Sequence, residues 1–324
     1  MGFAEDLRVL SNRTMRSVLI SLSHRRSLAR TAVRSPLTRS VVARFVAGET
    51  LEAALPAIAE LKRAGLRTTV DVLGESVTSA DHAAAAVDQY VATIAALSEH
   101  GLDANVSLKL TQMGLEIDPS TCLANVMRVV DAVRAADGFV RIDMEDHAKT
   151  GATLDVWRAA QDAYPKVGVV IQAALRRSSA DVDSIIAARG HVRLCKGAYD
   201  EPGAVAFRSR TAVDANYAQL MERLIIADAY PALATHDPKL IAKAIAIAET
   251  EGIGRDRFEF QMLYGVRRDL QRTLLDRGYT VRIYVPYGAE WYPYFMRRLA
   301  ERPANVAFML RAIAKEEGRR VRGH

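Results

Sequence analysis

Short apolar stretches alternate with longer amphipathic stretches along this chain of 324 residues. The short stretches are rich in β-branched residues and predict eight strands, at 68–73, 105–110, 139–144, 167–172, 192–196, 232–236, 258–263 and 280–284. The longer stretches predict helices at 51–62, 81–98, 119–136, 154–163, 180–188, 213–229, 238–250 and 267–277. Because helices separate the strands, we expect parallel pairing through right-handed crossovers, as in a (β/α)8 barrel of the TIM type with additional N-terminal helices. A doubly wound open sheet is the alternative.

The last predicted strand leads into a further helix. Residues 280–288 alternate between polar and β-branched side chains and end in a proline and a glycine, which indicates a strand with a tight exit. Pro293 is tolerated only in a first helical turn, where its missing N–H would have no partner. The helix is therefore expected to begin near Glu290 or Trp291.

Two adjacent arginines, Arg297 and Arg298, occupy this last helix. Neighbouring residues on a helix point about 100° apart, so the pair could hold one small anion, such as a carboxylate, from two sides. Tyr284 on the strand and Tyr294 on the helix could supply flat walls for a small ring. The alternative is a solvated arginine pair whose neighbouring tyrosines cover the protein surface.

Composition narrows the class of protein. Half of the residues are hydrophobic and a quarter are charged, and no apolar run approaches the roughly 20 residues that span a bilayer. The two cysteines, Cys122 and Cys195, are far apart in sequence and support neither a disulfide framework nor a cysteine metal site. This composition predicts a soluble protein of a reducing compartment.

The net charge of +6 comes from one end of the chain. Residues 1–40 contain eight arginines against Glu5 and Asp6, and this difference equals the whole excess. Such a segment is typical of a presequence, a membrane-surface helix or a basic helical arm, and we expect the arm. The predicted organisation is an arm packed on the barrel (1–65), the barrel itself (66–305) and a C-terminal helix with a basic tail (306–324).

Polar residues mark the predicted strand ends. Active sites of (β/α)8 barrels lie at the carboxyl ends of the strands. A single polar strand end often only meets water, but here every strand has one, which predicts a site. The residues are Glu75, Lys109, Asp143, Gln172, Arg193, Lys196, Thr235, His236, Gln261 and Tyr284.

Two other kinds of site are not expected. No Gly-x-Gly-x-x-Gly follows the first strand, which argues against a nicotinamide-binding Rossmann site. Residues 143–147 are rich in acidic groups, but successive side chains of a strand point to opposite faces, so we expect no metal site there.

Six segments in order resemble the proline dehydrogenase family, flavin-dependent barrel enzymes that begin proline catabolism. The resemblance covers about 45–305 of this chain. The segments are LGESV at 73–77, KLTQ at 109–112, RIDME at 141–145, RLCKGAY at 193–199, ATHD at 234–237 and RRLAE at 297–301.

The resemblance implies a role for each matching residue. Arg297 and Arg298 would bind the proline carboxylate, while Tyr199, Tyr284 and Tyr294 pack around the ring and Lys109 and Asp143 line the pocket. Asp143, Tyr199 and Arg193 would act in catalysis, and Glu75 would pair with Arg193 as a gate. Non-covalent FAD would be bound by Met144, Gln172, Arg193, Lys196, Gly197, Ala198, Thr235, His236 and Glu301.

The resemblance also implies partners. L-proline would be oxidised to 1-pyrroline-5-carboxylate, electrons would pass to a membrane quinone, and a separate dehydrogenase would act on the product. A cytoplasmic protein that makes peripheral contact with the inner face of the cell membrane fits this role, and no nucleic acid is expected. The alternatives are another flavin barrel, of the methylenetetrahydrofolate reductase kind, and a non-catalytic protein that uses its basic arm on nucleic acid or membrane.

Overall fold

The computed structural model describes residues 42–227 and 229–301. Within this part of the chain there are two compact units, residues 55–285 and residues 42–54 together with 286–301. The predicted basic arm (1–40) and the C-terminal tail (306–324) lie outside the described residues.

The larger unit is built on a closed parallel barrel. In the described part of the chain, eight strands pair in sequence order and β8 closes onto β1. They are β1 (Arg67–Val72), β2 (Asn105–Lys109), β3 (Phe139–Asp143), β4 (Val167–Gln172), β5 (His191–Cys195), β6 (Ala232–Ala234), β7 (Glu259–Leu263) and β8 (Thr280–Tyr287). The predicted barrel is confirmed, and the open doubly wound sheet is excluded.

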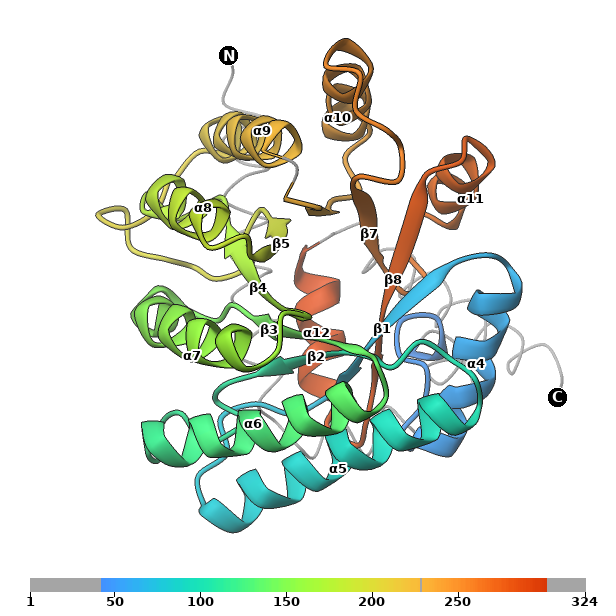
Figure 1. Ribbon diagram of the computed structural model, residues 1–324, viewed down its shortest axis with the longest axis vertical. Helices are drawn as coiled ribbons and strands as arrows, with labels where there is room; N and C mark the ends of the chain where they lie inside the picture. The colour runs from blue at the N-terminus through green and yellow to red at the C-terminus, as the bar shows by residue number, and fades with distance from the viewer. Residues whose placement is uncertain (1–41, 228, 302–324) are drawn as a thin grey trace, which may run out of the picture. The chain divides into compact units, whose positions relative to one another are not determined.

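Helices cover the outside of the strands (Figure 1). α4 (Leu51–Arg63) precedes β1, and the following strands alternate with α5 (Ala80–Glu99), α6 (Pro119–Ala135), α7 (Thr150–Ala163), α8 (Ser178–Ala187), α9 (Arg210–Ile226), α10 (Pro238–Thr250) and α11 (Arg268–Asp276). Side chains cap the first turns of α5 and α6. The Ser79 hydroxyl accepts from the His82 N–H (3.3 Å) at α5, and the Asp118 carboxylate accepts from the Thr121 N–H (2.8 Å) at α6.

Three differences from the predicted element boundaries concern α7, β6 and β8. α7 begins four residues earlier than expected, after a 3₁₀ turn η1 (His147–Lys149). β6 ends at Ala234, so Thr235 and His236 follow the strand. β8 continues through Pro286, where a stop was expected, and the Pro286 carbonyl accepts from the Ala47 N–H (2.9 Å). Proline is compatible with a strand position that needs no N–H donor.

The smaller unit contains α12 (Trp291–Glu301). This helix begins at Trp291, within the range expected from the position of Pro293. Phe45 packs against Phe295 with ring centroids 6.2 Å apart, and the Gly288 N–H donates to the Gly48 carbonyl (3.0 Å).

The barrel interior is polar. Side chains of strands that are not neighbours touch, as in the Arg193–Ser107 contact between β5 and β2 (2.9 Å), and such contacts can only pass through the interior. The alternate residues of the same strands, such as Val106, Leu108 and Leu194, are apolar and fully buried. They therefore face the helices, and the hydrophobic core lies between strands and helices.

Within the described residues, no helix combines the length and the apolar character that crossing a membrane requires.

Candidate active site

Arg193 is the centre of a hydrogen-bonded cluster inside the barrel. Its guanidinium donates to Asp143 Oδ1 from Nη1 (2.7 Å), to Ser107 Oγ from Nη2 (2.9 Å) and to Gln261 Oε1 from Nε (2.5 Å). It also lies over the Tyr284 ring, 5.2 Å from the centroid. Four strands other than its own therefore hold this side chain, which is only 5% exposed.

Asp143 connects this cluster to β8. Its Oδ2 accepts from the Tyr284 hydroxyl (2.8 Å), while Oδ1 accepts from Arg193. Both carboxylate oxygens are thus engaged by donors at the carboxyl end of the barrel. Three residues that the sequence placed in the site, on β3, β5 and β8, are in direct contact.

Lys109 and Asp71 form a second ion pair in the interior. Lys109 Nζ lies 3.0 Å from Asp71 Oδ1, and the Asp71 side chain is fully buried. Burial opposes the charge of Lys109, but Asp71 and Asp143 raise its pKa above the usual value. Burial raises the pKa of Asp71, and Asp143 raises it further, against the effect of Lys109. The register of β2 on β3 sets Lys109 level with Asp143, so the pair and the arginine cluster share one end of the barrel.

Gln172 and Gly197 lie together where β4 and β5 end. The Gln172 Nε2 donates to the Glu145 carbonyl (2.6 Å), which fixes the amide. Gly197 has a φ of +106°. A Cβ there would lie 3.0 Å from Gln172 Oε1 and 3.1 Å from the Ala174 Cβ, so a side chain would fill the space above β4.

Lys196 carries positive charge beside this space. Its Nζ lies 3.1 Å from Asp237 Oδ2 and 2.5 Å from Asp214 Oδ1, and about a quarter of the side chain is exposed. Against the effect of burial, the hydrogen bond from Lys196 lowers the pKa of Asp237. Asp237 also caps α10 through the Lys239 N–H (3.0 Å), so it holds Lys196 from a rigid helix start.

Thr235 and His236 follow β6. The Thr235 hydroxyl accepts from the Asp237 N–H (3.1 Å), which orders the turn into α10. The His236 Nε2 accepts from the Leu263 N–H (3.0 Å). An Nε2 that accepts leaves the proton of the neutral ring on Nδ1.

The remaining predicted residues of the larger unit lie at different depths. Met144 is buried, whereas Glu75 and Ala198 are exposed and Tyr199 is 42% exposed. The Glu75–Arg193 gate stays a prediction. The guanidinium of Arg193 is directed here toward Asp143, Ser107 and Gln261.

α12 carries the predicted carboxylate clamp. The Arg298 guanidinium lies over the Tyr294 ring, 5.2 Å from the centroid, and Tyr294 is buried. The structure describes the backbone of Arg297 and Glu301 but not their side chains. The clamp and the contact of Glu301 with a cofactor stay predictions.

Several residues of the cluster were not predicted as site residues. Ser107 lies two positions before Lys109, and Asp71 lies two positions before Leu73, the predicted end of its strand. Because residues two apart on a strand share a face, strand alternation could have placed both side chains inside the barrel. Glu145 is buried and accepts from the Thr111 N–H (3.0 Å) and hydroxyl (2.6 Å), and burial raises its pKa. Gln261 was recognised as a polar strand end, but its contact with Arg193 was not.

Among the described residues, no group of three or more His, Cys, Asp or Glu side chains is arranged to hold a metal ion. In the acid-rich segment, the His147 Nδ1 pairs with Glu201 Oε2 (2.5 Å).

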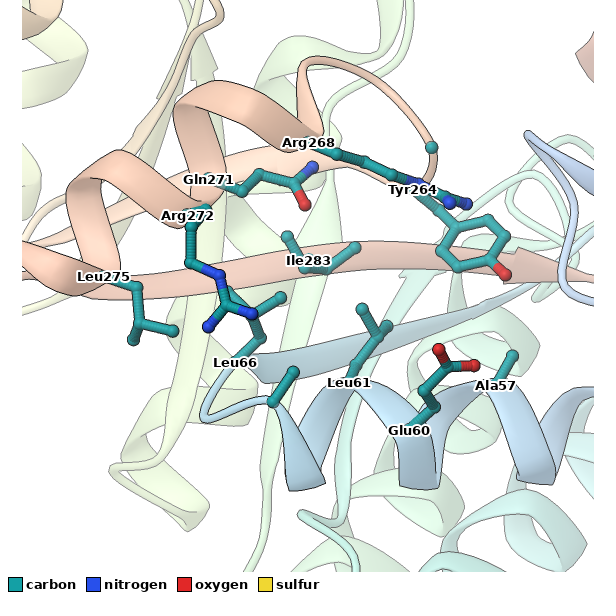
Figure 2. Close-up of a pocket in the computed structure, with 12 residues that line it drawn as sticks. Ala57, Glu60, Leu61, Leu66, Tyr264, Arg268, Gln271, Arg272, Leu275 and Ile283 are labelled. Atoms are coloured by element: carbon teal, nitrogen blue, oxygen red, sulfur yellow. The ribbon is translucent and has the colours of Figure 1, made fainter.

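A separate pocket of about 280 Å³ lies on the outer wall of the larger unit. Figure 2 shows Arg268 and Arg272 of α11 on one side and Glu60 of α4 on the other, with Leu61 and Ile283 between them. None of the predicted site residues lines it. The chemistry of the strand ends is therefore not located in this pocket.

Comparison with known proteins agrees with the resemblance found in the sequence. The sequence model described as proline dehydrogenase matches residues 54–311. Proline dehydrogenase 1 of Bacillus subtilis subsp. natto is 39% identical over 302 residues, which are 93% of this chain and all of that protein. Proline dehydrogenase of Deinococcus radiodurans is 40% identical over 277 residues, 84% of this chain and 89% of that protein.

A solved structure shares the fold. The crystal structure of proline utilization A (PutA) from Bdellovibrio bacteriovorus, inactivated by N-propargylglycine, superimposes with a TM-score of 0.76 at 26% identity. The match covers 81% of this chain and 32% of that one, so this chain spans about a third of that PutA. The sequence match removes the rival assignments to a folate-reducing barrel and to a non-catalytic protein. The chain belongs to the proline dehydrogenase family, oxidoreductases that act on the CH–NH group of proline.

Proposed function

We propose that this chain oxidises L-proline to 1-pyrroline-5-carboxylate with non-covalently bound FAD at the carboxyl end of the barrel. The observation that supports this most directly is the fixed guanidinium of Arg193. Three of its five N–H groups donate within the barrel interior, and the described residues leave the other two for a ligand. A cation held this firmly suits a site where negative charge gathers.

The residues around Gly197 fit a flavin nucleotide. The missing side chain leaves room beside Gln172, and Lys196 offers positive charge for phosphate groups. In this proposal FAD is held by Met144, Gln172, Arg193, Lys196, Gly197, Ala198, Thr235 and His236, with Glu301 of α12.

Oxidation of the ring removes a hydride from the carbon next to nitrogen and a proton from the nitrogen, and a carbon–nitrogen double bond forms. FAD, when bound, supplies the hydride acceptor, which no protein side chain can provide. Arg297 and Arg298 hold the substrate carboxylate, and Tyr199, Tyr284 and Tyr294 pack around the ring. Hydride leaves only from the neutral amine, because a charged nitrogen opposes the positive charge that develops on the neighbouring carbon.

Lys109 and Asp143 line the substrate side of the pocket. Both oxygens of Asp143 already accept hydrogen bonds, from Arg193 and Tyr284, so its first role is to orient these two side chains. Glu75, exposed after β1, closes the site by pairing with Arg193 once substrate is bound, which excludes water from the reacting atoms.

The two electrons pass to a membrane quinone, and a separate dehydrogenase acts on the product. Access to a quinone requires contact with a membrane surface. Eight arginines within residues 1–40 supply attraction to anionic lipid of about 1 kcal/mol per basic residue, weakened by salt. Removal of residues 1–40 should abolish salt-sensitive sedimentation with anionic liposomes while dye-linked proline oxidation continues. Undiminished sedimentation would assign the contact to another surface.

Anaerobic addition of L-proline to the purified, FAD-loaded protein tests the proposed reaction. The flavin absorbance near 450 nm should bleach without any added nucleotide, and the product should react with o-aminobenzaldehyde. A control with D-proline should bleach far more slowly. A flavin that stays oxidised with L-proline, but is reduced by a nicotinamide nucleotide, would refute the proposal.

A further inference from the structure

A chain of buried hydrogen bonds continues below Arg193. The Gln261 amide accepts from Arg193 Nε at Oε1 and donates from Nε2 to Glu259 Oε1 (2.5 Å). Arg282 Nε then donates to both oxygens of Glu259 (2.9 and 3.1 Å), and its Nη2 to one of them (3.1 Å). Arg282 Nη1 finally donates to the Thr68 carbonyl of β1 (2.9 Å).

The hydrogen bonds in the middle of this series have a defined direction. A glutamine amide offers an acceptor at one end and a donor at the other, and the two ends have nearly the same shape. Ionised Glu259 can only accept, so it selects the donor end of Gln261 and turns Oε1 toward Arg193. Two cations, Arg193 and Arg282, are thereby joined through one amide and one carboxylate.

Glu259 is held in its ionised form. It is 2% exposed, and burial opposes its charge, but the charge and hydrogen bonds of Arg282 lower its pKa below the usual value. A neutral carboxyl group could donate as well as accept and would leave the direction of the Gln261 amide open.

We propose that Glu259 and Gln261 are positioning residues for the oxidation: Glu259 fixes the direction of the Gln261 amide, which in turn fixes the guanidinium of Arg193 against the bound flavin. This inference rests on the proposed function, in which Arg193 faces FAD. With Nε anchored, the guanidinium cannot rotate about its own axis. The two N–H groups that the described part of the chain leaves for the flavin then keep one direction at no entropic cost during the reaction.

The matched test uses two variants. Gln261→Met keeps the size of the side chain and leaves the Glu259–Arg282 pair intact, but it removes the acceptor for Arg193 Nε. The double variant E259Q/Q261E exchanges carboxylate and amide. Residue 259 then donates to 261 and accepts from Arg282, residue 261 accepts from Arg193, and the buried charge is unchanged.

We expect flavin reduction by proline in Gln261→Met to slow by about tenfold or more, the effect of one hydrogen bond to a charged group. The reduction potential of the bound flavin should become more negative, while the Michaelis constant for proline stays within about twofold. E259Q/Q261E should recover both the rate and the potential.

Three results would overturn the inference. The first is Gln261→Met with an unchanged rate of flavin reduction and an unchanged reduction potential, and only a lower melting temperature. Gln261 would then have a purely structural role. The second is a charge-exchanged variant as impaired as Gln261→Met, since the direction of the amide would then not matter. The third is a native protein that binds FAD but is not reduced by proline, which refutes the proposed function and this inference with it.

Discussion

Replacing Lys109 by Met would leave a buried carboxylate without its cation. Lys109 Nζ and Asp71 Oδ1 are 3.0 Å apart, and Asp71 Oδ2 has no hydrogen-bond partner among the described residues. Methionine nearly matches the length of lysine and lacks the charge. The variant therefore removes one interaction with little change in packing.

The size of the effect follows from burial, and its pH dependence follows from Asp71. Breaking a buried ion pair costs about 3–5 kcal/mol of unfolding free energy. A carboxyl group whose pKa is raised by folding stabilises the protein most below its unfolded pKa of about 3.9, and this contribution is lost as the pH rises through the folded pKa. Lys109 lowers the pKa of Asp71, so its removal moves the folded pKa further up.

The stability difference between the native protein and Lys109→Met should therefore grow as the pH rises. Its slope is at most about 1.4 kcal/mol per pH unit, the limit for one proton. The contribution of Lys109 itself is constant from about pH 5 to pH 8. Its folded pKa is raised, so its stabilising effect is fully present below its unfolded pKa of about 10.4.

Urea unfolding, followed by circular dichroism at about pH 5, 6, 7 and 8, measures this difference. The double variant Asp71→Asn/Lys109→Met is the control, because it has no carboxyl group at position 71 to titrate and should show the same loss at every pH. If Lys109→Met lost equal stability at pH 5 and pH 8, the pair would not be the buried ion pair described here.

Three further substitutions test the site. Tyr284→Phe removes the hydroxyl that donates to Asp143 at 2.8 Å and should lower the unfolding free energy by about 1.5–3 kcal/mol, as measured in urea. Gly197→Ala should cost about 1–3 kcal/mol through its φ of +106° and weaken FAD binding in a flavin titration, whereas Gly151→Ala, whose added methyl group would meet no other atom within 4 Å, should bind FAD normally. Arg298→Ala should raise the Michaelis constant for proline about 30-fold to 1000-fold while FAD stays bound, and Arg298→Lys should recover part of the loss. A nearly unchanged Michaelis constant for proline in Arg298→Ala would refute the predicted binding of the proline carboxylate by this arginine.

The barrel could be predicted from the sequence because each strand and each helix has a local sequence pattern of its own. Residues 167–171 form a continuous apolar run between turn signals, and Pro238 opens a helix directly after a capping aspartate, so both elements could be assigned without tertiary information. β8 was cut short because Pro286 was read as a stop. The strand continues through this proline, which lacks only the N–H donor, and its carbonyl accepts from the Ala47 N–H.

The partners of Arg193 could not be predicted in the same way. Asp143, Ser107 and Gln261 are 50, 86 and 68 residues away from it, and only barrel closure brings them together. Strand alternation indicates which face a residue occupies, but the register of eight strands decides which residues meet. The Glu75–Arg193 gate was predicted from resemblance alone, whereas the contact with Asp143 required the geometry.

The charge balance of the barrel interior connects stability to the proposed reaction. Within the described strands, its ionisable groups include four cations, Lys109, Arg141, Arg193 and Arg282, and three carboxyl groups, Asp71, Asp143 and Glu259. Burial and the nearby charges of Arg193 and Arg282 lower the pKa of Arg141 to about 9, which still leaves it charged at neutral pH. These strands thus carry one positive charge more than their own carboxylates can neutralise, a balance that favours an anion at the open end of the barrel. A substrate carboxylate or a reduced flavin would supply that negative charge. The apolar layer between strands and helices maintains the fold, so the interior can remain charged while no ligand is bound.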